Sequence, residues 1–171
     1  KTIDWIEPVV AESVDQGESL KTLVDDLKSG TVDLLLMLGV NPVYDAPADL
    51  GFRDALLESE ALRVHVGLYL DETGELCQWH VPQAHFLEAW GDHRAFDGTV
   101  SLAQPLIAPL FGGRSILEVV STLRGNRNPD GRSLLETYWQ EQLGATSEGA
   151  EQDNFARRWR QMVHDGLIEH T

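Results

Sequence analysis

The chain has 171 residues, 42% of them apolar and 24% charged, which is typical of a globular protein of one ordinary domain with a sizeable core. Its formal net charge of −15 disfavours nucleic acid and anionic membrane surfaces as direct partners, because like charges repel. The single cysteine, Cys77, excludes an internal disulfide, a thiolate zinc site and an iron–sulfur cluster held by this chain alone. No apolar run approaches the roughly 20 residues of a membrane helix. Because the chain begins with Lys1 rather than Met, we expect it to be a piece of a longer chain.

The first half of the chain alternates between helical and strand patterns. In chain order, the expected elements are a helix, a strand, a helix and a strand over residues 19–30, 31–39, 48–59 and 61–70. The first helix is expected to begin at an N-cap on Ser19 and to end before Gly30. The inward faces of the two helices are expected to consist of Leu20, Leu23, Val24, Leu27, Leu50, Ala55 and Leu56. This order is typical of the α/β class, with mainly parallel strands joined by helical crossovers.

The second half predicts less regular structure followed by helices. Residues 71–77 open with acidic residues and predict one short helical turn, and 78–110 read as irregular apart from a short strand at 100–104. Helices are expected over 114–125, 132–144 and 153–166, with a turn at 126–131 and a polar linker at 144–152. The last helix has an apolar face made of Phe155, Trp159, Met162 and Val163.

The loop after the first strand raises the first question of function. The apolar run ends at Gly39, and Asn41 and Pro42 follow. Ligands of open α/β sheets bind beyond the carboxyl ends of the strands, where a glycine permits close approach of the backbone and an asparagine supplies donors and an acceptor. The same residues also form ordinary tight turns that cap helices. The loop carries neither a dinucleotide fingerprint nor a Walker-type Lys–Ser/Thr pair.

A cluster of imidazoles between residues 80 and 93 suggests a metal site as one hypothesis. His80, His85 and His93 lie near Glu88, but they lack the i, i+4 spacing of a helical zinc site and no HExxH motif is present. Trp79, Phe86 and Trp90 are interleaved with them, so structural or interface roles are favoured over a metal.

Two further sets of residues have a functional and a structural interpretation. Asp71, Glu72 and Glu75 form a group of carboxylates suited to acid–base chemistry, although acids in a first helical turn more commonly offset the helix dipole. No serine lies in a GxSxG elbow, so no catalytic constellation stands out. Trp79, Trp90 and the proline-rich segment 104–113 either anchor a partner or pack in the core.

Three stretches together resemble a known family. They are LLLMLGVNPVYDAPADLGFRDAL (34–56), VGLYLDETGELCQWHVPQAHFLEAWGD (66–92) and AFDGTVSLAQPLIAPLFGG (95–113). The ordered motifs GxNP, ETxEL, PxAxxxE and DGTV are similar to those of the molybdopterin oxidoreductase family over about residues 3–125. WHVPQAHFLEAWGD is similar to the Tat-variant-translocated branch, which forms the iron–sulfur subunit of alternative complex III.

The resemblance implies a fold and a set of site residues. The fold is a single Rossmann-like α/β domain (1–171) of the DMSO-reductase/formate-dehydrogenase type, with a core at about 3–125 and a helical part at about 126–171, excised from a larger chain. In catalytic members the GxNP loop and the segment after the second strand line the guanine-dinucleotide part of the molybdenum cofactor. The cofactor-binding residues carried over onto this chain are Gly39, Asn41, Pro42, Asp71, Glu72 and Thr73. The resemblance implies no catalytic residue and no metal ligand in this piece.

The sequence departs from the catalytic pattern, which decides between two functions. Trp79 and His80 stand where catalytic members have a plain apolar run. In the alternative complex III branch the domain carries no molybdenum cofactor, and the iron–sulfur clusters lie elsewhere in the parent chain. We therefore expect a non-catalytic scaffold domain of an iron–sulfur subunit in a membrane-bound quinol-oxidising electron-transfer complex. The alternative is a molybdopterin guanine dinucleotide-binding domain of an active molybdenum oxidoreductase, with Asn41, Asp71 and Glu72 contacting the guanosine.

The resemblance also implies partners and a location. The partners are other domains of the parent chain and subunits of the membrane complex, including cytochrome c subunits, with neither nucleic acid nor direct insertion into the membrane. The location is the periplasmic side of the bacterial cytoplasmic membrane. Such a piece is expected to expose apolar surface around Trp79, Trp90 and residues 105–111.

Overall fold

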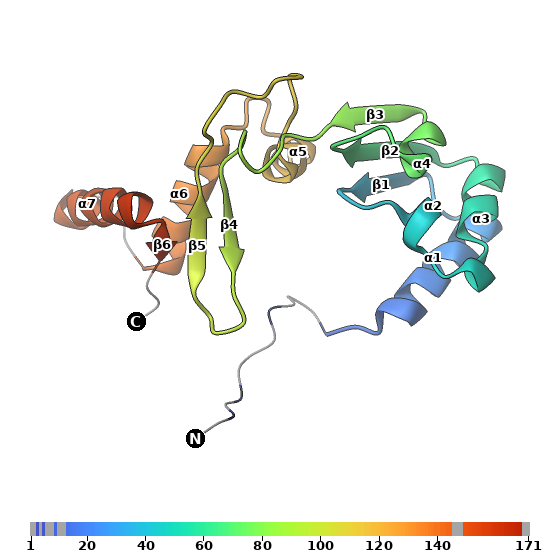
Figure 1. Ribbon diagram of the computed structural model, residues 1–171, viewed down its shortest axis with the longest axis horizontal. Helices are drawn as coiled ribbons and strands as arrows, with labels where there is room; N and C mark the ends of the chain where they lie inside the picture. Colours follow the sequence, from blue (N-terminus) through green and yellow to red (C-terminus); the bar gives the residue numbers. More distant parts are fainter. Residues whose placement is uncertain (1–2, 4, 6–8, 10–12, 145–148, 169–171) are drawn as a thin grey trace. The chain divides into compact units, whose positions relative to one another are not determined.

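The computed structural model describes residues 3, 5, 9, 13–144 and 149–168, and its elements are drawn in Figure 1. The chain divides into two compact units, which are described separately. The parallel-sheet unit contains residues 13–83 and 111–116, and the antiparallel-sheet unit contains 84–110, 117–144 and 149–168. The chain is therefore mixed α/β, while its organisation as one domain stays a prediction.

The parallel-sheet unit is built on three parallel strands in the order β1-β2-β3. Its elements are α1 (Gln16–Ser29), β1 (Leu34–Leu38), α2 (Pro42–Asp45), the 3₁₀ turn η1 (Ala48–Leu50), α3 (Phe52–Glu58), β2 (Leu62–Gly67), α4 (Glu72–Glu75) and β3 (Trp79–Pro82). The arrowheads of the three strands point the same way in Figure 1. The parallel pairing of β1 and β2 through a helical crossover confirms that this unit mixes helices with parallel strands, while the Rossmann-like domain type stays a prediction. The third strand lies in the segment expected to be irregular, where Pro82 ends it after four residues.

Helix α1 has the predicted inward face and the predicted end, but a different N-cap. Its residues Val24 and Leu27 are buried and Leu20 and Leu23 pack against the same cluster, which confirms the predicted inward face. Gly30 adopts the left-handed conformation (φ 72°) that ends the helix, as expected. The N-cap prediction was wrong. The helix begins earlier, and the carboxylate of Asp15 accepts from the backbone N–H of Glu18 at 3.0 Å.

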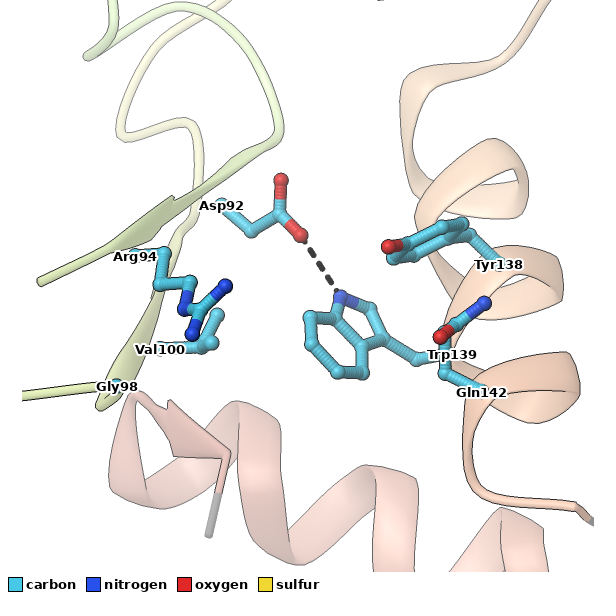
Figure 2. A pocket seen from close by; sticks show the side chains of 7 residues that line it. All are labelled: Asp92, Arg94, Gly98, Val100, Tyr138, Trp139 and Gln142. Atoms are coloured by element: carbon cyan, nitrogen blue, oxygen red, sulfur yellow. Dashed lines mark hydrogen bonds between the residues drawn. The ribbon is translucent and has the colours of Figure 1, made fainter. Parts of the chain in front are cut away.

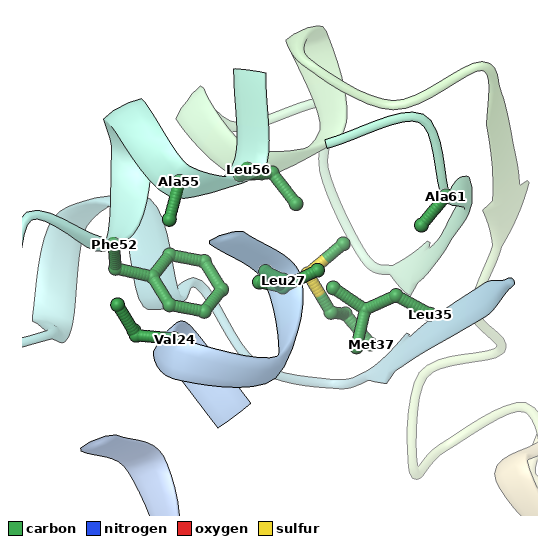
Figure 3. Packing of buried hydrophobic residues seen from close by; sticks show 8 residues of the cluster. All are labelled: Val24, Leu27, Leu35, Met37, Phe52, Ala55, Leu56 and Ala61. Carbon is green, nitrogen blue, oxygen red and sulfur yellow. The ribbon is translucent and has the colours of Figure 1, made fainter. Parts of the chain in front are cut away.

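One apolar cluster holds the helices against a single face of this sheet (Figure 3). Its buried members are Val24, Leu27, Leu35, Met37, Phe52, Ala55, Leu56 and Ala61. Within β1 only the alternate residues Leu35 and Met37 are buried, because successive side chains of a strand point to opposite faces. The strand expected over residues 31–39 is therefore confirmed at Leu34–Leu38, with one face buried. Helices α1 and α3 cover one face, and Leu34 on the other face is 48% exposed.

The antiparallel-sheet unit has a different architecture that the sequence did not indicate. Its elements are β4 (Gly91–Arg94), β5 (Val100–Ala103), α5 (Ile116–Leu123, whose first residue belongs to the other unit), α6 (Gly131–Gln142), α7 (Gly149–Asp165) and β6 (Leu167–Ile168). The three strands form an antiparallel sheet in the order β4-β5-β6. Strand β5 confirms the short strand expected at 100–104, whereas β4 and β6 were missed.

A second apolar cluster forms the core of this unit. It comprises Val100, Leu102, Leu135, Trp139, Phe155, Trp159, Met162 and Ile168. Phe155, Trp159 and Met162 confirm the predicted apolar face of the last helix. Val163, on the same face, is partly buried and packs against the cluster. That helix begins at Gly149, so residues 149–152 of the expected linker are helical, and residues 145–148 lie outside the described part of the chain. In the ranges that the structure describes, no helix is long and apolar enough to cross a membrane.

The first cluster provides a test of the packing. Leu56 is completely buried on α3, whereas its neighbour Leu57 is 45% exposed. We expect Leu56→Ala to lower the free energy of unfolding by about 2–5 kcal/mol, because it removes buried methyl groups and leaves a cavity. Leu57→Ala on the same helix is expected to cost less than about 1 kcal/mol. Urea denaturation followed by circular dichroism measures both, and equal losses would contradict the placement of α3.

Candidate functional site

The candidate site lies where β1 and β2 end. Parallel neighbours bring their carboxyl ends to the same edge of a sheet, and here Leu38 is paired with Val66. The N–H of Gly39 donates to the carbonyl oxygen of Val66 at 2.7 Å, which ties the first loop to the second strand. The loop after β1 and the loop after β2 therefore come together, and they contain all six residues assigned to cofactor binding.

Asn41, Thr73 and Glu72 form one hydrogen-bonded group across these two loops. The Thr73 hydroxyl donates to Oδ1 of Asn41 at 2.6 Å, and Nδ2 of Asn41 donates to Oε2 of Glu72 at 2.8 Å. Thr73 is completely buried and Glu72 is exposed. The hydrogen bond from Asn41 is the main cause that lowers the pKa of the Glu72 carboxyl below its usual range. Glu72 therefore presents a fixed negative charge at the rim of the site.

The same threonine caps helix α2 from a distance in the sequence. Asn41 occupies the N-cap position of α2, and its side chain makes no cap hydrogen bond. The N–H of Val43, in the first turn, donates to the Thr73 hydroxyl at 3.0 Å. Thr73 thus satisfies an N–H group that the helix itself leaves without a partner, and this frees the Asn41 amide to bind Glu72. Pro42, at the first position of α2, has no N–H that needs a partner.

His65, in the middle of β2, was missed by the sequence reasoning and is the centre of the buried part of the site. Its side chain is completely buried, and its Nε2 lies 3.1 Å from the carbonyl oxygen of Val40 and 3.8 Å from a carboxylate oxygen of Asp71. Asp71 also caps α4, because its Oδ1 accepts from the N–H of Gly74 at 2.9 Å. A histidine flanked by two valines, in the stretch RVHVG, is the sequence signal that identifies it.

The contacts of His65 determine which ring nitrogens of His65 and His80 carry a proton. A carbonyl oxygen only accepts, so Nε2 of His65 carries the proton that is donated to Val40. In neutral His65 the other ring nitrogen, Nδ1, is then an acceptor, and it lies 3.0 Å from Nδ1 of His80 on β3. His80 therefore donates its Nδ1–H to His65. Burial, together with the neighbouring His65 ring, lowers the pKa of His80 below its usual range.

Two glycines make room for the buried imidazole. A Cβ on Gly67 would lie 2.5 Å from Cε1 of His65, and one on Gly74 would lie 3.0 Å from its Nδ1. Gly39 meets a different constraint. Its φ of +66° requires glycine, and a Cβ there would lie 3.2 Å from both Oε1 of Gln83 and Cδ1 of Ile116. The space beside Gly39 is therefore filled by the chain's own side chains.

The other candidate groups occupy separate places. His85 accepts through Nδ1 from the N–H of Leu87 at 3.3 Å and its ring lies tilted against that of Phe86, while His93 is exposed on β4. In the part of the chain described by the structure, no three His, Cys, Asp or Glu side chains are grouped to hold a metal ion. Glu88 accepts from the N–H groups of His85 and Leu110, and these bonds lower the pKa of its carboxyl.

Cys77 lies behind the site and is held as a thiol. Burial raises the pKa of Cys77, and its Sγ donates to the carbonyl oxygen of Thr73 at 3.2 Å. A protonated, half-buried thiol is a poor nucleophile. The polar side chains described at this edge of the sheet hydrogen-bond to one another and to the backbone. These bonds hold the loop after β1 against the loop after β2.

No family model matches the chain, and no curated protein matches it. The function is therefore argued from the residues and the geometry above.

Thr73→Val tests the buried junction. The valine keeps the shape of threonine but leaves the N–H of Val43 and the Oδ1 of Asn41 without their shared partner. We expect a loss of about 1–3 kcal/mol in the free energy of unfolding, the cost of unsatisfied polar groups in a buried place. Thr137→Val, at an exposed position of α6, makes the same chemical change and is expected to stay within about 0.5 kcal/mol. Equal effects of the two substitutions in urea denaturation would contradict the junction.

The histidine pair predicts a dependence of stability on pH. Because the pKa of His80 is lowered in the folded chain, the unfolded chain takes up a proton there more readily as the pH falls. The contribution of His80 to stability is thus fully present above the ordinary pKa of about 6.5 and is lost as the pH falls through it toward the lower, folded value. Urea denaturation between about pH 7.5 and about pH 5 is expected to show a slope that His80→Asn reduces and the control His93→Asn leaves unchanged. An unchanged slope in His80→Asn would refute this assignment.

Proposed function

We propose that this chain is a non-catalytic scaffold domain, of the molybdopterin-oxidoreductase type, in an iron–sulfur subunit of a membrane-bound quinol-oxidising electron-transfer complex. The observation that carries the assembly role is the uncovered apolar face of the parallel sheet. The kind of complex comes from the resemblance of residues 3–125 to the molybdopterin oxidoreductase family.

The face that α1 and α3 leave uncovered is an apolar surface at the start of the strands, and it is closed at Val66, which is completely buried. Strand register places Leu34 beside Leu62, and Leu36 beside Val64, which in turn lies beside Trp79. Paired residues of parallel strands point to the same face, so these five side chains form one surface, called here the open sheet face. Leu34, Leu62 and Trp79 are 48%, 45% and 64% exposed. Parallel sheets are stable with both faces covered, so this face needs a covering layer.

A second apolar surface, in the antiparallel-sheet unit, supports the same role. The N–H groups of Leu106 and Ile107 donate to the carbonyl of Leu87, which brings two loops together. Exposed apolar side chains gather on these loops: Phe86, Leu87, Leu106, Ile107 and Leu110. An apolar patch of this kind marks a contact with another protein.

The arrangement at the ends of β1 and β2 supports a scaffold over a cofactor site. Both ends of the Asn41 amide are engaged, its Oδ1 by Thr73 and its Nδ2 by Glu72. The space beside Gly39 is filled by Gln83 and Ile116. A loop that holds a nucleotide leaves such groups available to it, so these residues fit the guanine-dinucleotide part of a molybdenum cofactor poorly.

The alternative function is a molybdopterin guanine dinucleotide-binding domain of an active molybdenum oxidoreductase. One observation favours it. Asn41, Asp71 and Glu72 lie beyond the carboxyl ends of parallel strands, where α/β sheets bind ligands. The location at the periplasmic side of the membrane and the cytochrome c partners belong to both versions of the proposal.

The two functions differ in what the native protein contains. We would isolate the full-length protein under mild conditions from its source and measure molybdenum, tungsten, iron and released pterin, together with the co-purifying chains. The scaffold function predicts iron and partner subunits with neither pterin nor molybdenum nor tungsten. Near-stoichiometric pterin with molybdenum or tungsten would overturn it in favour of the alternative.

The open sheet face is tested in the same preparation with paired variants. Trp79→Ser/Leu62→Ser removes two exposed apolar groups from the face, and we expect it to reduce the recovered partner chains about tenfold or more. Tyr44→Ser/Leu57→Ser makes a matched change, one aromatic residue and one leucine, at exposed positions outside the face, and is expected to keep the partners. Unfolding curves of both variants separate loss of binding from loss of fold. Full recovery of the partners with the Trp79 variant would contradict the role of this face.

A further inference from the structure

A pocket in the antiparallel-sheet unit has the features of a small-molecule site and is separate from the site described above. It lies between the β4–β5 hairpin and helix α6, as Figure 2 shows, and has a volume of about 550 Å³. Its lining consists of Asp92, Arg94, Gly98, Val100, Tyr138, Trp139 and Gln142. This volume lies within the range of about 300–1,000 Å³ typical of ligand sites.

Strand β4 forms one wall of the pocket and carries two opposite charges on the face of the sheet that is turned toward α6. Asp92 and Arg94 are paired in register with Leu102 and Val100 of β5, both of which are buried in the core of the unit. Directly paired residues of antiparallel strands point to the same face. The aspartate and the arginine therefore point toward α6 rather than away from it, about 7 Å apart along the strand.

The carboxylate of Asp92 is held by a hydrogen bond, whereas the guanidinium of Arg94 has no such partner in the described ranges. Nε1 of Trp139 donates to Oδ2 of Asp92 at 2.9 Å, and this bond holds the carboxylate toward the helix. The Arg94 guanidinium forms no hydrogen bond or ion pair within the described ranges, and it does not pair with Asp92 although both project from one strand toward α6 (Figure 2). A cation and an anion that face one cavity without touching each other leave room for a molecule that bridges them.

We propose that this pocket binds a small zwitterion of the α-amino acid class. Its carboxylate takes the planar donor fork of Arg94, the residue best suited to pair with a carboxylate. Its ammonium group takes the Asp92 oxygen that the indole leaves open, and the phenol of Tyr138 and the amide of Gln142 supply further polar contacts at the rim. The ligand's side chain lies against Val100 and the rings of Tyr138 and Trp139, which stand edge to face at 5.3 Å.

The Asp92 carboxylate also decides between two kinds of anion. By itself, the guanidinium of Arg94 can donate two parallel hydrogen bonds to a carboxylate or to a phosphate with equally good geometry. A phosphate brings up to two negative charges beside a fixed aspartate, in a chain of net charge −15, and meets repulsion there. A zwitterion brings a positive charge to the same place. The proposal does not depend on the scaffold function, because none of its residues lies on the open sheet face or in the loops after β1 and β2.

Binding is tested by NMR titration of the ¹⁵N-labelled chain with L-phenylalanine as the probe. The Trp139 indole N–H, which lies in the pocket, is the reporter. We expect a saturable shift of that signal, a strongly reduced response to N-acetyl-L-phenylalanine and to L-phenylalanine amide, each of which lacks one charge, and no response to phenyl phosphate. Absence of saturable binding of L-phenylalanine, or a stronger response to phenyl phosphate, would overturn the proposal.

Three variants locate the binding in the pocket. Arg94→Met keeps much of the stem and removes the fork. Asp92→Asn keeps an acceptor for the Trp139 indole and removes the charge. Each is expected to weaken binding about tenfold or more, because each deletes a charge-assisted contact. Arg127→Met, at an exposed position of the turn before α6, makes the same change in net charge as Arg94→Met and is expected to leave the affinity unaltered. Unchanged affinity in Arg94→Met, with its fold intact by circular dichroism, would refute the site.

Discussion

A parallel sheet has two faces to cover, and in this protein the chain's α1 and α3 cover only one of them. Leu35 and Met37 on the covered face meet Val24, Leu27 and Leu56 in a closed apolar cluster. Their neighbours on the same strand point the opposite way and end in the open sheet face. Because side chains alternate along a strand, the other apolar residues of β1 and β2 point to the second face, where Leu34 and Leu62 are exposed and Val66 is buried. The chain therefore carries an apolar surface by construction, and this is the basis for assigning it a role in assembly.

The edge of the sheet is fastened in a way that fits a supporting domain. Thr73 caps α2, binds Asn41 and through it orders Glu72, so that two loops distant in the sequence become one unit. Beneath them His65 joins Val40, His80 and Asp71 with no space left over Gly67. Polar groups that satisfy one another at the end of a sheet stabilise the geometry of the loops, whereas a catalytic or cofactor site keeps donors and acceptors available to the ligand.

The sequence was sufficient where local periodicity and packing agree. The apolar spacing of α1 and α7 predicted their buried faces, and Gly30 marked the end of α1. It failed where tertiary contacts replace local signals. Ser19 is a good capping residue, but Asp15 caps the helix, and Asn41 leaves the capping of α2 to a threonine about 30 residues further along the chain. Strands β3 and β4 were missed because each has only four residues, and because β3 ends in a proline and β4 contains no apolar side chain. Of the site, the resemblance assigned Asn41, Glu72 and Thr73 to cofactor binding, which stays a prediction, whereas their hydrogen bonds to one another, His65 and the pocket at Arg94 needed the structure.

The most direct test of the central claim is hydroxyl-radical footprinting of Trp79, followed by mass spectrometry, on the isolated chain and on the native assembly. We expect rapid oxidation of Trp79 in the isolated chain and strong protection in the assembly, with Tyr44, an exposed residue outside the open sheet face, oxidised similarly in both. Equal oxidation of Trp79 in the two samples would mean that no partner covers the open sheet face and would contradict the assembly role.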